Sequence, residues 1–314
     1  MYKKRLILFA TSFILASSSI NISINKEKSN KLSKHITEYS STISNDNFQI
    51  GAHRGFSSLK VENTKESITL AAKKDYIDYI EMDIRITKDK KLVLSHDNTI
   101  YSSNNKKEEI SNTKYKKIIT STYKNKNSLL NFIPSPSIES ELKKERKRKL
   151  HDKSYNIIGL KEGIKNCKRK KILLDLKCEE GKEKEFIKIL QKELENIDTS
   201  NIVLQSLNLD LIRLLQKETN YNTIAIIKEE KDLHCITEFS NIAIHKDLTN
   251  YKLVKKLLKG NKELAIWTIN SSKELEDIKK ESKDLYKKII YITDYPDLIA
   301  TKLNEEEKIK QYQK

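Results

Sequence analysis

Three short polar segments between residues 51 and 97 contain side chains that are suited to chemistry. The first holds His53 and Arg54, the second holds Glu81 and Asp83, and the third ends an apolar run with His96. Histidine titrates closest to neutral pH, and carboxylates are the usual protein ligands of hard divalent cations. Any one of these residues alone would more often be structural or simply solvated. It is their concentration in one stretch that indicates a site.

Glu81 and Asp83 are separated by one residue, so both side chains point to the same side of a β-strand. In a barrel strand that side is the interior. Two carboxylates buried side by side are unfavourable unless a cation compensates them. The pair therefore predicts a divalent metal with oxygen ligands, either Mg²⁺ or Ca²⁺.

The elements that must position these residues alternate between short apolar runs and longer patterns of helical period. The candidate strands are Phe48–Ala52, Ile77–Ile84, Lys171–Leu176, Ile202–Ser206, Thr223–Ile227, Asn241–Ile244, Leu264–Ile269 and Ile289–Ile292. The candidate helices are Thr64–Lys74, Lys182–Glu195, Asp210–Glu218, Tyr251–Leu258, Lys273–Glu281 and Asp297–Glu306. This alternation predicts an α/β fold, a (β/α)8 TIM barrel, whose active site lies at the carboxyl ends of the strands. A doubly wound sheet is the alternative, and the sequence has no glycine-rich phosphate loop to favour it.

Residues 101–156 interrupt the alternation between the second and third candidate strands. The stretch shows no clear strand pattern, contains Pro134 and Pro136, and is strongly basic between Lys143 and Lys149. A solvated, partly helical insertion is the simpler interpretation, because runs of charge are usually exposed. The alternative is an electropositive lid or a docking patch for an anionic polymer.

The chain begins with the pattern of a secretory signal. Lys3, Lys4 and Arg5 precede a mostly apolar run from Leu6 to Ala16 that is short for a membrane-spanning helix. We expect residues 1–19 to be a signal peptide or, if uncleaved, a membrane anchor. Residues 20–47 are predicted to be a polar linker, and residues 48–314 the barrel domain. The folded part would then be secreted or anchored on the outer side of the cytoplasmic membrane.

The composition is that of a folded protein with a strong positive charge. Hydrophobic residues make up 37% of the chain, which excludes wholesale disorder, and 61 Lys or Arg against 44 Asp or Glu give a net charge of +17. The 3 cysteines lack C-x-x-C spacing and support neither a disulfide scaffold nor a structural zinc site. Lys, Ile and Asn are abundant throughout, so the charge has little functional weight and no nucleic-acid partner is predicted. The charge does allow one interaction with a partner: the basic insertion could contact an anionic membrane or cell-wall polymer.

Taken together, the motifs resemble those of the glycerophosphodiester phosphodiesterase family, within the superfamily of phosphatidylinositol-specific phospholipase C-like phosphodiesterases. In the family's order stand His53-Arg54-Gly55, Glu62-Asn63-Thr64, Glu81-Met82-Asp83, Thr87-Lys88-Asp89 and His96-Asp97. Later matches are Leu174–Lys177, Gln205-Ser206, Trp267–Asn270 and Ile292–Pro296, so the likeness covers most of residues 48–303. The resemblance implies a (β/α) barrel, in agreement with the strand count. It also implies metal-dependent hydrolysis of a small-molecule glycerophosphodiester to an alcohol and sn-glycerol 3-phosphate.

Residue by residue, the resemblance implies a metal held by Glu81, Asp83 and Asp175. Glu62 would be a further ligand, or would orient the neighbouring catalytic side chains. Asp175 stands where the family usually has Glu, and its side chain is one methylene shorter. Val61, Lys90 and Leu207 are further departures, and none of them supplies a catalytic group.

The resemblance also assigns roles in the chemistry. His53 and His96 would be the general acid and base, while Arg54 and Lys177 would place positive charge on the phosphate oxygens. Trp267 would pack against the glycerol of the substrate, or would be a buried barrel aromatic.

Two other functions share features with this sequence. A related barrel phospholipase, of the phosphatidylinositol-specific or sphingomyelinase D type, shares the histidine pair, but the two acids on one strand argue against its metal-free version. An inactive cationic surface-binding protein is opposed by the intact histidines, Arg54 and Lys177. The remaining histidines, His151, His234 and His245, lack a partnering motif and are predicted to be structural.

Overall fold

The computed structural model describes residues 27, 30, 31, 33, 34, 48–126, 137–258 and 262–312. Eight parallel strands follow one another around a closed barrel, because β1 pairs with both β13 and β2. They are β1 (Gln49–Ala52), β2 (Tyr79–Ile86), β8 (Lys171–Leu176), β9 (Ile202–Ser206), β10 (Asn222–Ile227), β11 (Ile242–His245), β12 (Leu264–Trp267) and β13 (Ile289–Thr293). A ninth strand, β3 (Leu92–Leu94), extends β2 in the antiparallel direction. The predicted barrel is confirmed, and the doubly wound sheet is wrong.

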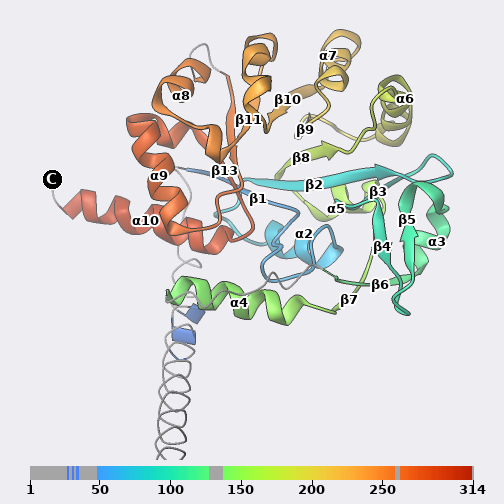
Figure 1. Ribbon diagram of the computed structural model, residues 1–314, viewed down its shortest axis with the longest axis horizontal. Helices are drawn as coiled ribbons and strands as arrows, with labels where there is room; N and C mark the ends of the chain where they lie inside the picture. Colours follow the sequence, from blue (N-terminus) through green and yellow to red (C-terminus); the bar gives the residue numbers. More distant parts are fainter. Residues whose placement is uncertain are drawn as a thin grey trace, which may run out of the picture.

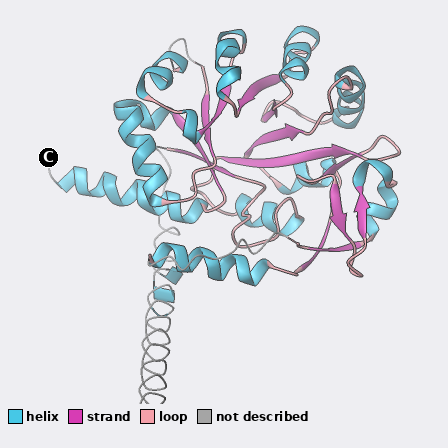
Figure 2. Ribbon diagram, viewed as in Figure 1, coloured by secondary structure: helices cyan, strands magenta, loops and turns pink. Residues whose placement is uncertain are grey.

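Helices cover the outside of the barrel between successive strands (Figures 1 and 2). The α-helices are α2 (Lys65–Ala72), α5 (Leu160–Asn166), α6 (Glu183–Leu194), α7 (Leu209–Glu218), α8 (Tyr251–Leu257), α9 (Ser272–Ser282) and α10 (Pro296–Tyr312). The 3-10 helices η2 (Glu230–Glu238), η3 (Lys246–Leu248) and η4 (Lys283–Lys288) complete this layer. Thr64 caps α2 by accepting a hydrogen bond from the backbone N–H of Ser67, as its residue type favours. Helix α6 buries the face that carries Phe186, Ile187, Leu190 and Leu194, so the core between sheet and helices follows from the helical period.

The barrel interior changes from apolar to polar along the strands. An apolar layer of Tyr79, Leu173, Val203 and their neighbours fills the end at which the strands begin. Because side chains alternate along a strand, the next inward positions on β2 and β8 are Glu81 and Asp175. The polar site residues therefore lie at the carboxyl ends of the strands, above a packed core.

The described part of the insertion, residues 101–126 and 137–156, is folded, which corrects the prediction of a solvated stretch without strands. It contains β4 (Thr99–Tyr101), β5 (Lys107–Glu109), η1 (Ile110–Asn112), α3 (Tyr115–Thr120), β6 (Thr122–Lys124), α4 (Ile138–Leu150) and β7 (Ser154–Asn156). Strand β4 pairs with β5, and β6 pairs with β7. Ile100, Ile110, Ile118 and Tyr123 form a small apolar core of their own together with Val93 of β3. Three-residue strands are too short to show a period of two, so the sequence pattern could not reveal them.

Helix α4 carries the basic run and is docked on the barrel beside α10 (Figure 1). Leu142 packs against Tyr295 and Leu298. Arg146 makes two hydrogen bonds to the carboxylate of Asp297, at 3.0 and 2.7 Å, and both side chains are almost fully buried. One residue of the predicted solvated run is thus an internal anchor.

The predicted signal segment, residues 1–19, lies outside the described residues, and export stays a prediction. Within the predicted linker the five described residues are helical, and four of them are exposed. Among the parts of the chain that the structure describes, no helix has the length and apolar character needed to cross a membrane.

Candidate active site

Three carboxylates meet inside the mouth of the barrel. Asp83 on β2 lies directly opposite Asp175 on β8 in the sheet register, and Glu81 lies two positions before Asp83. One oxygen of each falls within 4.8 Å of one oxygen of the other two. The three residues are 2%, 1% and 7% exposed, so the charges are removed from water. The structure thus brings together three of the four predicted metal ligands.

Burial makes three negative charges at this spacing unfavourable. Burial and the neighbouring Asp83 raise the pKa of Glu81 to about 8, and burial also raises the pKa of Asp175. Although burial works against it, Lys177 and Arg54 hold the pKa of Asp83 well below its usual range. Among the described residues, Asp175 Oδ1 has no hydrogen-bond partner. Three buried carboxylates, one of which has an oxygen without a hydrogen-bond partner, are suitable ligands for a hard divalent cation such as Mg²⁺ or Ca²⁺.

Two cationic side chains border the carboxylates. Lys177 Nζ lies 2.9 Å from Asp83 Oδ1 and 2.6 Å from Asp175 Oδ2. Arg54 Nε lies 3.3 Å from Asp83 Oδ2, and its terminal nitrogen is 3.0 Å from Glu62 Oε1. Glu62 does not belong to the cluster of three carboxylates. The structure therefore supports its predicted role in orienting neighbouring side chains, and not its alternative role as a metal ligand.

The turn after β1 presents its own backbone to the site. Arg54 has a φ of 57° and Gly55 a φ of 77°, and the backbone N–H of Arg54 donates to Glu81 Oε2 at 2.8 Å. Gly55 is required here, because a Cβ would lie 2.7 Å from the backbone carbon of Ser67. Asn63, with a φ of 55°, donates to Asp83 Oδ2 at 2.7 Å and accepts from the Asp83 N–H at 3.0 Å. Asn63 belongs to the Glu62-Asn63-Thr64 motif, but its hydrogen bonds with Asp83 were not predicted from the sequence.

His53 is held by the carboxylate of Asp294, a residue that was not predicted to be part of the site. Its Nδ1 lies 2.7 Å from Asp294 Oδ1, and its Nε2 faces Glu81 Oε2 at 4.0 Å. Asn270 and Ser57 also donate to Asp294, at 2.6 and 3.1 Å. Burial would lower the pKa of His53, but Asp294 more than offsets this and the pKa is raised, while that of Asp294 falls to about 2. The signal for Asp294 was its place in the Thr-Asp-x-Pro motif, but its partner is 241 residues away.

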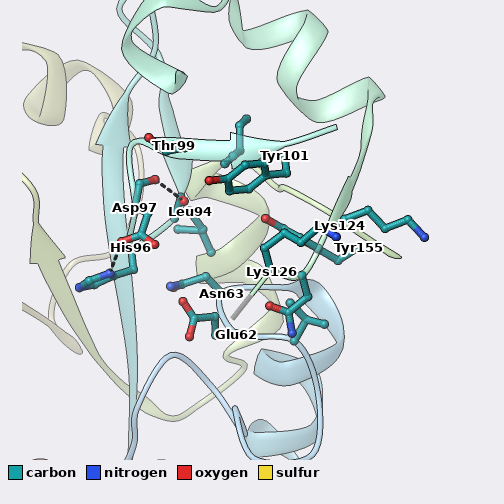
Figure 3. A pocket seen from close by; sticks show the side chains of 14 residues that line it. Glu62, Asn63, Leu94, His96, Asp97, Thr99, Tyr101, Lys124, Lys126 and Tyr155 are labelled. Carbon is teal, nitrogen blue, oxygen red and sulfur yellow. Dashed lines mark hydrogen bonds and ion pairs between the residues drawn. The ribbon is translucent and has the colours of Figure 1, made fainter. Parts of the chain in front are cut away.

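His96 follows β3 at the opposite wall of the site. Its Nδ1 lies 2.8 Å from Asp97 Oδ1, and Arg85 Nε donates to the His96 carbonyl at 2.7 Å. Figure 3 shows His96 and Asp97 at one side of a cavity, with Tyr155 of the insertion at the other. The volume of this cavity is about 100 Å³. The hydrogen bond with Asp97 orients the ring, and the bond from Arg85 holds the backbone at this position. The ring is half-buried and can be reached from solvent.

A second cavity of about 100 Å³ joins the predicted residues into one site. It is lined by His53, Arg54, Glu81, His96, Asp175, Lys177 and Trp267, and Asp83 contacts one of these residues, Lys177. Around Trp267 the wall is apolar, formed by Ile226, Ala243 and Ile292. Trp267 contacts His245 edge to face, at 5.0 Å between ring centroids. All the residues that the sequence predicted for the chemistry, except Asp83 and Glu62, therefore border one space.

The site has the parts that cleavage of a phosphodiester needs: oxygen ligands for a metal, two cations and two histidines. The model of the glycerophosphoryl diester phosphodiesterase family matches residues 53–298. The chain belongs to this family. It is accordingly a phosphoric diester hydrolase, and the resemblance of its motifs to this family is confirmed.

Solved structures of similar fold agree with this assignment. A phosphodiesterase from Oleispira antarctica, solved with the product sn-glycerol-3-phosphate, is 19% identical, with 82% of this chain and 96% of the other covered and a TM-score of 0.61. A glycerophosphodiester phosphodiesterase from Thermotoga maritima is 20% identical, with coverages of 82% and 97% and a TM-score of 0.54. One from Agrobacterium tumefaciens is 17% identical, with coverages of 81% and 99% and a TM-score of 0.55. At these identities the likeness supports the barrel fold. A search of curated proteins found no match.

Proposed function

We propose that this protein hydrolyses glycerophosphodiesters to an alcohol and sn-glycerol 3-phosphate, with a divalent cation bound by Glu81, Asp83 and Asp175. The proposal is based on three buried carboxylates, which share one site with His53 and His96. When bound, the cation would withdraw negative charge from the phosphate oxygens. The product seen with the Oleispira antarctica protein supports the same substrate class.

Arg54 and Lys177 bind and orient the phosphate in this proposal. Both line the central cavity, and both already face the carboxylates. A phosphodiester is an anion, so these cations attract it into the barrel mouth and stabilise the charge that builds up on its oxygens in the transition state. Their ion pairs with Asp83 keep them in place before the substrate arrives.

His53 is assigned as the general acid and His96 as the general base. Asp294 raises the pKa of His53, which favours the protonated ring needed to donate a proton to the leaving alcohol. His96 lies at the other side of the cavity and takes the proton of the nucleophile. The nucleophile is the adjacent glycerol hydroxyl, which gives a cyclic phosphate that water then opens, or it is water itself.

Trp267 and the apolar wall around it form the glycerol side of the cavity. The carbon face of glycerol packs on such a surface while its hydroxyl groups turn towards the polar groups. This assignment places the glycerol on the side of β10, β11 and β12.

The proposal is tested by incubating the purified protein with glycerophosphoglycerol and measuring sn-glycerol 3-phosphate. We expect release of product that stops with chelator and returns with added Mg²⁺ or Ca²⁺. Lack of product with both cations would exclude the function. If the release of sn-glycerol 3-phosphate were unchanged after complete removal of metal, the three carboxylates would not act as metal ligands in the reaction, although the hydrolysis itself would be confirmed.

A further inference from the structure

A larger cavity of about 330 Å³ lies on the side of the catalytic centre that faces α4. We call it the α4 cavity and define it by Ser57, Ser58, Asn125, Lys147, Leu150 and His151. His53 and Arg54 line both this cavity and the central one. A phosphodiester bound at these two residues would therefore have space for one substituent on the Trp267 side and for the other in the α4 cavity.

The wall that α4 contributes is held in place by the barrel. The buried Arg146–Asp297 pair and the contact of Leu142 with Tyr295 fix the helix. Asn125 donates to the carbonyl of Leu150 at 2.8 Å, which ties the end of the helix to the strand side of the insertion. The cavity is thus a built feature between two fixed elements, as ligand sites usually are.

Lys147 is a charged residue of this wall that has no ion-pair partner among the described residues. The acids of α4 pair with other lysines: Glu139 with Lys143, Glu141 with Lys144 and Glu145 with Lys149. The acids that line the cavity are also engaged, since Glu62 bonds to Arg54 and Asp294 to His53. Among the described residues, no carboxylate lies within ion-pair distance of Lys147, which is exposed and lines the cavity.

We propose that the α4 cavity binds the leaving alcohol, and that Lys147 selects alcohols that carry a second phosphate. The inference rests on the proposed function and specifies its substrate class. Hydroxyl and amide groups of Ser57, Ser58 and Asn125 suit a polyol, and a lysine ammonium is a point-charge ligand for phosphate. A quaternary ammonium headgroup would instead meet an uncompensated positive charge.

The test compares two substrates that differ by one glycerophosphate unit, glycerophosphoglycerol and 1,3-bis(glycerophospho)glycerol. The wild-type protein should have the higher kcat/KM for the second. Lys147→Ala should lower the ratio of the two kcat/KM values by roughly 3- to 5-fold, the upper size of one exposed charge contact. Arg148→Ala is the matched control: it removes the same charge from the next position, which is exposed and does not line the cavity, and it should leave the ratio within about twofold.

A ratio that Lys147→Ala leaves unchanged, or that Arg148→Ala lowers equally, would overturn the assignment of Lys147 while hydrolysis itself continued. A wild-type preference for glycerophosphocholine over both polyol substrates would overturn the headgroup class. If the wild-type protein released glycerol 3-phosphate from none of the three, the proposed function would fail, and this inference with it.

Discussion

Asp294 controls His53 through a hydrogen bond between residues 241 positions apart. The carboxylate orients the ring and stabilises its protonated form, so it acts through His53 and is a positioning residue. It cannot be replaced by its amide without loss, because Asn keeps the shape but removes the charge.

Asp294→Asn is expected to lower kcat by at least about 10-fold and to lower the pKa of His53. A general acid must be protonated, so the alkaline limb of the pH profile of kcat/KM should move to lower pH. The profile measures this directly. Ser57→Ala removes another donor to Asp294 but leaves its charge, and the limb should stay in place. A limb that does not move in Asp294→Asn would show that His53 is not the group that titrates there.

Asp175 is predicted to bind the metal despite its short side chain. Asp175→Asn should weaken binding of Mg²⁺ or Ca²⁺ by at least roughly 10-fold in calorimetric titrations, because it removes a charge and a ligand oxygen. Glu62→Gln is the matched control, since Glu62 lies outside the carboxylate group. An equal loss of metal affinity in both variants would show that Glu62 is also a ligand. An unchanged affinity in Asp175→Asn would show that Asp175 is not a ligand.

At the scale of elements, α4 links the insertion to the barrel through one buried ion pair. The sequence could not show this, because Arg146 stands in a run of basic residues and its partner Asp297 is 151 residues away. Runs of charge are exposed on average, and only the tertiary contact distinguishes Arg146 from Arg148.

Arg146→Ala should lower the free energy of unfolding by about 3–5 kcal/mol, because it leaves the Asp297 carboxylate buried without its partner. Chemical denaturation measures the change. Arg148→Ala, on the exposed side of the same helix, should change stability by less than about 0.5 kcal/mol. If Arg146→Ala changed the free energy of unfolding only slightly, the Asp297 carboxylate would be hydrated in the variant, and this ion pair would not anchor α4.

The barrel strands were predictable where apolar runs were continuous. The bounds of β8 and β9 agree with the predicted ranges to the residue, because each strand contains a continuous apolar run, Ile172–Leu174 and Ile202–Leu204, as strands buried on both faces do. Strand β2 begins two residues later than predicted, at Tyr79. The residues that line the candidate site were predictable from motifs with fixed local spacing. The contact of Asp294 with His53 was missed because it depends on a partner that only the fold supplies.

At the scale of the whole molecule, the cost of the buried carboxylates should appear in stability. Without metal, the raised pKa of Glu81, about 8, means that the folded protein holds a proton which the unfolded chain releases at lower pH. This stabilising contribution is present at acidic pH and is lost as the pH rises towards 8. Chelated protein should therefore melt at a lower temperature at pH 8 than at pH 6.

Saturating Mg²⁺ or Ca²⁺ should raise the melting temperature, and more at pH 8 than at pH 6, because the ion binds the ionised carboxylates of the folded state. Differential scanning calorimetry at both pH values tests this. A melting temperature that does not respond to either ion at pH 8 would contradict a metal site at Glu81, Asp83 and Asp175.

The most direct test of the account is the turnover number of His53→Ala, His96→Ala and the double variant on glycerophosphoglycerol, with folding verified by circular dichroism. Each single change should lower kcat by at least roughly 10²-fold, and the double variant should lose less than the product of the two losses, because the residues act as a unit. Near-normal turnover of either folded single variant would contradict the paired-histidine site.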